Sequence, residues 1–131
     1  MATIFTKIIR GEIPCYKIVE EDRFLALLDI NPIQRGHTLV IPKREVDYIF
    51  DLSVDESGAL FRFAHRVALA LKQVVPCRRI GVAVLGMEVP HAHIHLVPMN
   101  HNGDLDFSGP RSIMTPEAFT ELAQQISSVF K

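Results

Sequence analysis

The stretch Pro90-His91-Ala92-His93-Ile94-His95-Leu96-Val97-Pro98 decides how the rest of this chain is interpreted. Its three histidines alternate with apolar residues, it shows no helical period, and a proline ends it. Strict alternation is typical of a β-strand with two unlike faces. The pattern therefore predicts a strand over residues 91–97 whose three imidazoles point to one side, with same-face neighbours about 6.6 Å apart.

A row of imidazoles indicates chemistry on an anion. Histidine changes charge near neutral pH, so the row can neutralise, position or attack a negatively charged group, and it can carry protons. The alternative is a polar strand face with no chemical role. Three histidines at a period of two, in a chain that has six, make that alternative the weaker one.

The bulk composition describes one globular domain over residues 1–131. The hydrophobic share of 48% and the charged share of 22% are those of a folded rather than a disordered chain. Lys and Arg form no long run, so we expect no large nucleic-acid surface. The two cysteines form no C-x-x-C motif and are expected to be reduced, although a bridge between them stays an alternative.

The beginning of the chain and its hydropathy suggest a compartment. The N-terminus lacks the apolar segment of a signal peptide, and no apolar stretch is long enough to span a membrane. We therefore expect a protein without a membrane association, located in the cytoplasm.

Hydrophobic periods divide the chain into helices and strands. Helices are predicted over residues 3–10, from the capping box Ser53-Val-Asp-Glu56 to about Val75, and from Thr115-Pro116 onward. Strands are predicted over residues 16–20, 24–30, 37–41, 80–85 and 91–97. Because the strands are mostly neighbours in sequence, the order predicts an α+β fold with a mostly antiparallel five-stranded sheet and helices on one face.

Asp29 is an acidic residue within the apolar stretch 24–30. A carboxylate in such a place needs a partner or a ligand, because burying an unpaired charge is costly. A cap of the following Asn31-Pro32 turn is an equally simple role for it.

These segments together resemble the histidine triad (HIT) superfamily. His91-x-His93-x-His95 followed by two apolar residues is similar to the motif of that family, and residues 4–14, 25–30 and 36–43 resemble its N-terminal stretch and its second and third strands. The chain is nearer to the nucleoside-phosphoramidase-like branch than to the longer uridylyltransferases. The resemblance implies a HIT-like fold and a two-fold homodimer, which the apolar long helix and fourth strand also favour.

The resemblance also implies hydrolysis or transfer at the α-phosphate of a purine nucleotide conjugate: a phosphoramidate, a dinucleoside polyphosphate or a mixed anhydride. His93 would be the nucleophile and form a nucleotidyl-imidazole. His91, His95 and His37 would orient it and hold the phosphate oxygens. Asp29 would accept hydrogen bonds from the ribose hydroxyls. The residues implied for the base pocket, which on pattern alone are equally well core residues, are Ile4, Phe5, Ile8, Leu27 and Ile30.

The chain departs from the family at a metal site. Many members bind zinc through an N-terminal C-x-x-C, a histidine after the Ile-Pro-Lys segment, and a histidine of the triad. Here Thr3 and Thr6 stand at the cysteine positions and Glu45 at that histidine position. Threonine supplies no thiolate, so we expect no metal and no other cofactor.

A second departure lies just before the triad. Gly86-Met87 stands where the family often has Gly-Gln, and Glu88 follows. Met87 and Glu88 are expected beside the phosphate, where the glutamine of the family would assist the leaving group.

Two functions of other classes compete with the hydrolase. Three imidazoles could hold Zn²⁺ with water in the fourth position, although three successive positions on one strand face do not converge well. A nucleotide-binding protein without turnover is the other alternative, and Met87 favours it.

Overall fold

The fold is organised around one antiparallel five-stranded sheet. A computed structural model describes residues 2–131 of the chain. The strand order is β1-β2-β3-β5-β4, and all four neighbouring pairs are antiparallel. The strands are β1 (Lys17–Glu20), β2 (Phe24–Leu28), β3 (Thr38–Pro42), β4 (Arg79–Ala83) and β5 (Ile94–Met99). This arrangement confirms the predicted α+β class and the five-stranded sheet.

Local capping signals explain where the three α-helices begin. The helices are α1 (Ile4–Ile9), α2 (Val54–Val74) and α3 (Pro116–Val129), and η1 (Ile49–Asp51) and η2 (Asn102–Asp104) are short 3₁₀ turns. The side chains of Thr3, Ser53 and Thr115 each accept a hydrogen bond from a backbone N–H of the first helical turn. Glu56 completes the capping box of α2. The sequence therefore predicted the start of each α-helix correctly.

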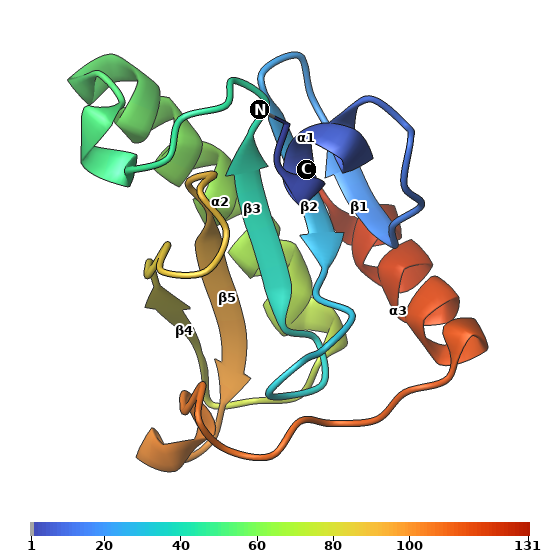
Figure 1. Ribbon diagram of the computed structural model, residues 1–131. Coiled ribbons are helices and arrows are strands. Elements are labelled where there is room, and N and C mark those ends of the chain that lie inside the picture. The colour runs from blue at the N-terminus through green and yellow to red at the C-terminus, as the bar shows by residue number, and fades with distance from the viewer. Residues whose placement is uncertain (1) are drawn as a thin grey trace.

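The helices cover both faces of the sheet, contrary to the prediction that they share one. In Figure 1, α2 and α3 lie behind the sheet and α1 lies in front of it. The larger core joins the sheet to α2 and α3, and a smaller one places Phe5 of α1 against Leu25, Leu27, Leu39 and Ile41. Because β2 and β3 are buried on both sides, α1 is the element that closes the second face.

The histidine strand is shorter than predicted. β5 begins at Ile94, so His91 and His93 lie in the segment that leads into it. The reason is a change of backbone partner: His91 N–H donates to the Val89 carbonyl (2.8 Å) and Ala92 N–H to the Val46 carbonyl (2.7 Å) instead of joining the ladder. His37 also lies just outside a strand, because the neighbouring strand β3 begins one residue later, at Thr38.

The two ends of β5 therefore have different surroundings. The N-terminal end carries the histidines and lies beside α1, and the C-terminal end pairs Met99 with Arg79 of β4. Within residues 2–131, none of the helices has the length and apolar character that crossing a membrane requires.

Candidate functional site

His37 and His95 form a buried, directly hydrogen-bonded pair at the centre of the sheet. His37 precedes β3, His95 is in β5, and His37 Nε2 lies 2.9 Å from His95 Nδ1. The Ile33 N–H donates to His37 Nδ1 (3.2 Å), so a neutral His37 carries its proton on Nε2 and donates it to His95. A neutral His95 then carries its own proton on Nε2. The pair thus presents one N–H donor to the site.

His93 has the opposite arrangement of protons. Its Nδ1 lies 2.7 Å from the backbone carbonyl oxygen of His91, which can only accept, so Nδ1 carries the hydrogen. The lone pair of Nε2 is therefore available. The ring centroid lies 4.7 Å from that of His95 and 5.0 Å from that of Phe5. A nucleophilic nitrogen and an N–H donor consequently stand side by side.

His91 serves the protein rather than a ligand. Its side chain is fully buried, Nε2 lies 2.8 Å from the Pro42 carbonyl oxygen, and Nδ1 lies 3.0 Å from the hydroxyl of Thr3. Both ring nitrogens are therefore engaged by the protein. This geometry favours the orienting part of the role that the resemblance implied for His91, and it leaves no ring nitrogen of His91 to hold a phosphate oxygen.

Burial keeps the central histidines neutral. Desolvation lowers the pKa of His37 to about 4 and that of His95 to about 3, and it lowers the pKa of His93 as well. The positive charge of Arg111 lowers the pKa of His37 and of His95 further, whereas Asp29 opposes the shift at His37. At neutral pH the imidazole of His93 is therefore unprotonated at Nε2, as a nucleophile must be.

Asp29 caps the turn that follows it and lies near a histidine, and its contact with a ribose stays a prediction. Its Oδ1 accepts from the Asn31 N–H (2.8 Å), which is the turn cap, and its Oδ2 lies 3.6 Å from His37 Nε2. The carboxylate thus lies beside the His37–His95 pair.

The apolar residues implied for a base pocket divide into two groups. Phe5 and Leu27 are buried in the smaller core, against which Ile8 packs. Ile4 and Ile30 are 47% and 70% exposed. The exposed pair is therefore free to contact a ligand, whereas the buried group first of all holds α1 on the sheet.

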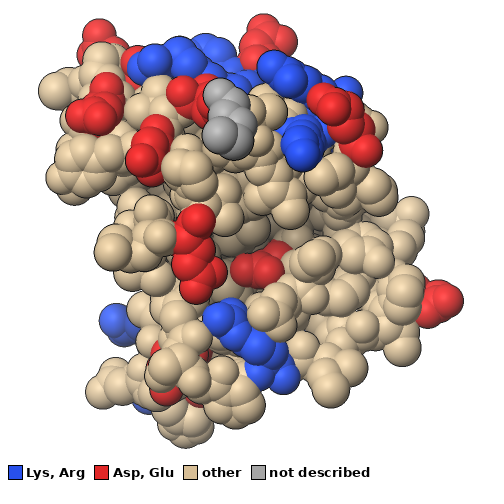
Figure 2. Space-filling model, in the orientation of Figure 1, with Lys and Arg blue, Asp and Glu red and all other residues tan. Residues whose placement is uncertain are grey.

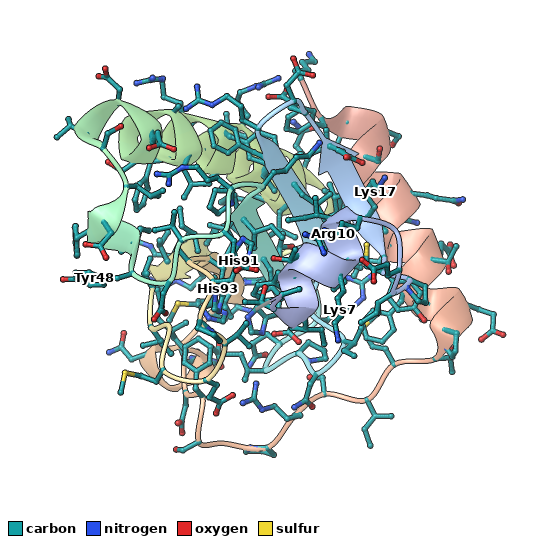
Figure 3. All side chains as sticks on the ribbon, turned by 45° about the horizontal axis from the view of Figure 1, so that its top comes forward. Lys7, Arg10, Lys17, Tyr48, His91 and His93 are labelled. Carbon is teal, nitrogen blue, oxygen red and sulfur yellow. The ribbon has the colours of Figure 1, made fainter. Side chains whose placement is uncertain are left out.

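Met87 lines a hollow next to His93. It is 89% exposed and lines a largely apolar hollow of about 520 Å³ together with His93, Tyr48 and Phe50. Figure 3 shows His91 and His93 between α1 and the segment that carries Tyr48. Glu88 is exposed in the same loop. Met87 therefore borders the open space around His93, and its place beside a phosphate stays a prediction.

Residues 106–111 form a wall of the site that the sequence did not reveal. The Phe107 ring lies 4.7 Å from that of His95 and 5.9 Å from that of His37. Arg111 donates to the carbonyls of Asn31 (3.1 Å) and Phe107 (2.9 Å). Figure 2 shows a hollow on this face with acidic side chains in and beside it and basic ones just below. The segment has no regular period, so only its glycines and prolines carried a signal, and that signal was for a loop.

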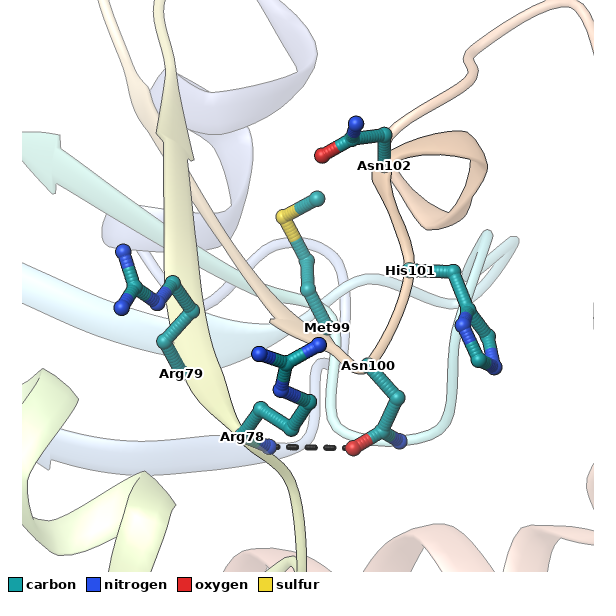
Figure 4. Close-up of a pocket in the computed structure, with 6 residues that line it drawn as sticks. All are labelled: Arg78, Arg79, Met99, Asn100, His101 and Asn102. Atoms are coloured by element: carbon teal, nitrogen blue, oxygen red, sulfur yellow. Dashed lines mark hydrogen bonds between the residues drawn. The ribbon is translucent and has the colours of Figure 1, made fainter.

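A second hollow lies at the far end of β5. Figure 4 shows its lining residues, which are Arg78, Arg79, Met99, Asn100, His101 and Asn102. The Arg78 N–H donates to the Asn100 side chain (3.0 Å). None of its lining residues belongs to the histidine cluster, so we treat it as separate from the candidate site.

Comparison with known proteins decides the family. The family model described as HIT domain matches residues 10–102, which include all of the histidine cluster. The chain belongs to the HIT domain family. It is 32% identical to the adenosine 5'-monophosphoramidase of Schizosaccharomyces pombe over 133 residues, covering 100% of both chains.

Solved structures of this HIT family agree with the fold. A HIT-like protein from Bartonella henselae, described as involved in cell-cycle regulation and containing an unknown ligand, has a TM-score of 0.82 at 30% identity and covers 96% of this chain and 94% of its own. A zinc-bound histidine triad protein from Mycobacterium smegmatis has a TM-score of 0.81 at 28% identity, with 98% and 96% covered. These likenesses confirm the HIT-like fold expected from the sequence.

The residues at the family's zinc position do not suit a metal. Thr3 and Thr6 offer only hydroxyls, and the ring nitrogen of His91 that faces them already lies within hydrogen-bonding distance of Thr3. We therefore predict that a chelator leaves the melting temperature of this protein unchanged, because a structural zinc site whose metal is removed normally unfolds. A lowered melting temperature that added zinc restored would contradict the prediction.

The alternative function as a metal-binding protein rests on a different set of residues. Among residues 2–131, ligand atoms of Asp29, His37 and His95 lie within 4.8 Å of one another, whereas the three triad histidines do not converge as a set. Both nitrogens of His37 are already within hydrogen-bonding distance of protein groups, so a metal would displace one of them. Metal analysis of protein purified without a histidine tag shows whether a metal binds to this group of residues or whether His37 keeps its hydrogen bonds.

The buried pair makes stability depend on pH. The unfolded chain protonates His37 below pH about 6.5, whereas the folded protein does so only near pH 4, so the unfolded state binds more protons between these values. The free energy of unfolding should therefore fall as the pH drops from about 6.5 to about 4, by on the order of 2 to 3 kcal/mol for one such group.

Urea unfolding across this range measures the effect. His37→Asn should flatten the curve. His65→Asn on the exposed side of α2 is the matched control, since it removes one imidazole and leaves the cluster intact. A parent protein with equal stability at pH 4.5 and pH 7 would show that the buried pair does not resist protonation.

Proposed function

We propose that this protein hydrolyses nucleotide conjugates at the α-phosphate through a nucleotidyl-histidine intermediate on His93. One observation carries the proposal: the His93 ring holds its hydrogen at Nδ1 against the His91 carbonyl, so that Nε2 is free beside the N–H donor of His95. The relative named as an adenosine 5'-monophosphoramidase supports an adenosine phosphoramidate as the first substrate to test.

The geometry supports a two-step course. His93 Nε2 attacks the α-phosphorus, the bond from phosphorus to the leaving nitrogen breaks, and the leaving amine takes its proton from solvent. The Nε2–H of His95 donates to a phosphate oxygen and stabilises the charge that builds there, and His37 Nε2–H, hydrogen-bonded to His95 Nδ1, holds this tautomer of His95. A water then attacks the phosphorus, loses a proton to solvent and releases the mononucleotide from His93.

A substrate panel tests the proposed activity. The parent protein should release mononucleotide from adenosine and guanosine phosphoramidates, and the same assay should include dinucleoside polyphosphates and mixed anhydrides. A protein that binds mononucleotide and turns over none of these substrates would instead be the non-catalytic nucleotide-binding protein. We also infer that Asp29 and the exposed Ile4 and Ile30 contact the nucleoside, and reduced affinity in Asp29→Ala would support this.

We propose a homodimer that pairs through β4 and α2. β4 is an edge strand, and exposed apolar side chains line it and α2: Val82, Leu85, Phe61 and Leu69. Edge strands left exposed invite pairing with another chain. Sedimentation at micromolar concentration should find a dimer, and Val82→Lys should shift it toward monomer. A parent protein that sediments as a monomer would contradict the prediction.

The cytoplasm remains the proposed compartment. Cys15 and Cys77 are both free thiols, which suits a reducing environment. We also keep the proposal that no large nucleic-acid surface exists: along the upper edge in Figure 2, where the basic side chains gather, acidic ones lie among them.

A further inference from the structure

Thr3, Thr6 and Glu45 form a hydrogen-bonded chain that ends on His91. The Thr3 hydroxyl lies 3.0 Å from His91 Nδ1 and 3.1 Å from the Thr6 hydroxyl. The Thr6 hydroxyl donates to the Glu45 carboxylate, and the Thr3 N–H donates to the same oxygen (3.1 Å). These contacts join the start of α1 to the segment after β3 and to the segment before β5. In Figure 3, His91 lies beside α1.

The protons of this chain have one consistent assignment when His91 is neutral. Pro42 has only a carbonyl to offer His91 Nε2, so Nε2 carries the hydrogen and Nδ1 must accept. The Thr6 hydroxyl is committed to Glu45, because a carboxylate can only accept. The Thr3 hydroxyl is then the one that donates to His91 Nδ1. Its oxygen also accepts from the Thr6 N–H (3.1 Å), which caps α1, and this backbone bond, rather than a bond between the two hydroxyls, joins Thr6 to Thr3.

Glu45 is suited to anchor the outer end of the chain. The two hydrogen bonds from Thr6 and from the Thr3 backbone lower its pKa, so that it is an ionised acceptor at neutral pH. The neighbouring Val46 carbonyl holds the Ala92 N–H (2.7 Å), between His91 and His93. The segment 42–46 thus holds the approach to β5 through both side chain and backbone.

The network reaches the nucleophile through one backbone atom. The carbonyl oxygen of His91 accepts the Nδ1–H of His93 (2.7 Å), which keeps the lone pair on Nε2. Moving the His91 ring would move that carbonyl and weaken the contact that selects this tautomer. The rigidity of His91 is therefore transmitted to the nitrogen that has to attack.

We propose that Thr3, Thr6 and Glu45 are positioning residues, which lock the His91 ring by hydrogen bonds and thereby fix His93 in its Nδ1–H tautomer without a metal. The role in turnover rests on the proposed function, whereas the effect on the tautomer of His93 does not. The two are tested by separate measurements.

Four variants isolate the network. Thr3→Val keeps the shape of the side chain and removes its hydroxyl, and Thr3→Ser restores the hydroxyl. Thr6→Val breaks the link to Glu45 and leaves the Thr3 cap of α1 in place. Thr115→Val is the matched control, because it removes the same kind of N-cap from α3 and makes no contact with a histidine.

Nitrogen-15 NMR of labelled histidine tests the tautomer directly. The parent protein, Thr3→Ser and Thr115→Val should each show His91 as a neutral Nε2–H ring and His93 as a single Nδ1–H tautomer. Thr3→Val should show a mixture of His93 tautomers, and Thr6→Val a smaller admixture. A parent protein with doubly protonated His91, or a folded Thr6→Val and Thr3→Val with unchanged His93, would overturn the proposal.

Kinetics with an adenosine phosphoramidate tests the consequence. Thr3→Val should lower kcat about 10-fold to 10²-fold, the range for loss of an outer hydrogen-bond partner of a functional histidine, and leave KM within about threefold. Thr3→Ser should recover kcat to within about threefold of the parent, and Thr115→Val should leave it unchanged. Equal losses in Thr3→Val and Thr115→Val would mean that helix capping alone matters. A parent protein without turnover would refute the proposed function and leave the NMR result as the test of the network.

Discussion

Replacing His93 by alanine is expected to lower kcat at least about 10³-fold, with mononucleotide affinity within about tenfold of the parent. The reason is that among the triad histidines only His93 combines a free Nε2 lone pair with a position beside the donor of His95. Its ring also packs against that of Phe5 at 5.0 Å, so the variant has to be checked for an unchanged fold. Initial rates on an adenosine phosphoramidate, with nucleotide binding by calorimetry, measure both effects.

His65→Ala is the matched control for this experiment. It removes an imidazole from the exposed surface of α2, where no contact with the cluster exists, and should keep the activity of the parent. His95→Ala should lower kcat, because it removes the N–H donor that stabilises charge on the phosphate oxygens. Normal turnover by His93→Ala together with an inactive His95→Ala would show that the two roles are assigned the wrong way round.

Replacing Met87 by glutamine is expected to raise activity on poor leaving groups by up to about 10²-fold. A thioether donates no hydrogen bond and accepts only weakly, whereas an amide does both. Met87 borders the same hollow as His93, so we expect an amide there to reach the bond that breaks. A gain of this size corresponds to one hydrogen bond to a charged group. In the parent, phosphoramidates and mixed anhydrides should be cleaved far faster than simple nucleotide esters.

Rates on a series of substrates that differ only in leaving group test this prediction. Glu88→Gln is measured alongside, because the Glu88 carboxyl group is exposed in the same loop and could serve as a donor when protonated. Equal rates across the series in the parent protein would refute the role of Met87. So would a folded Met87→Gln variant that binds nucleotide and shows no selective gain.

The parts of the fold that follow local rules were predictable from the sequence. The capping box at Ser53 and the proline after Thr115 placed two helices, and the apolar stretches placed β2 and β3, because these signals act within a few residues. The start of β5 was not predictable. It depends on the bond from Ala92 N–H to the carbonyl of Val46, which lies far away in sequence.

The candidate site shows the same division. The alternation of His91, His93 and His95 predicted the position of the histidine cluster and, through the resemblance it carries, the family, because residue type and spacing are local features of the sequence. The pairing of His37 with His95 depends on strand register, and the wall from Phe107 to Arg111 depends on a loop without a period. The bond from Thr3 to His91 joins residues 88 positions apart. The threonines at the two zinc-binding cysteine positions of the family indicated only that zinc was not expected at this place.

Mass spectrometry of the enzyme during a single turnover tests the covalent mechanism most directly. The protein, in excess, is mixed with an adenosine phosphoramidate. The reaction is stopped at short times in base, which spares a phosphorus–imidazole bond, and the protein is then digested. We expect an adenylyl group on the peptide that contains His93, localised to that residue, which forms and decays at the rate of turnover and does not form in His93→Ala. Product release with no adduct at any time, or an adduct on a different histidine, would contradict nucleophilic catalysis by His93.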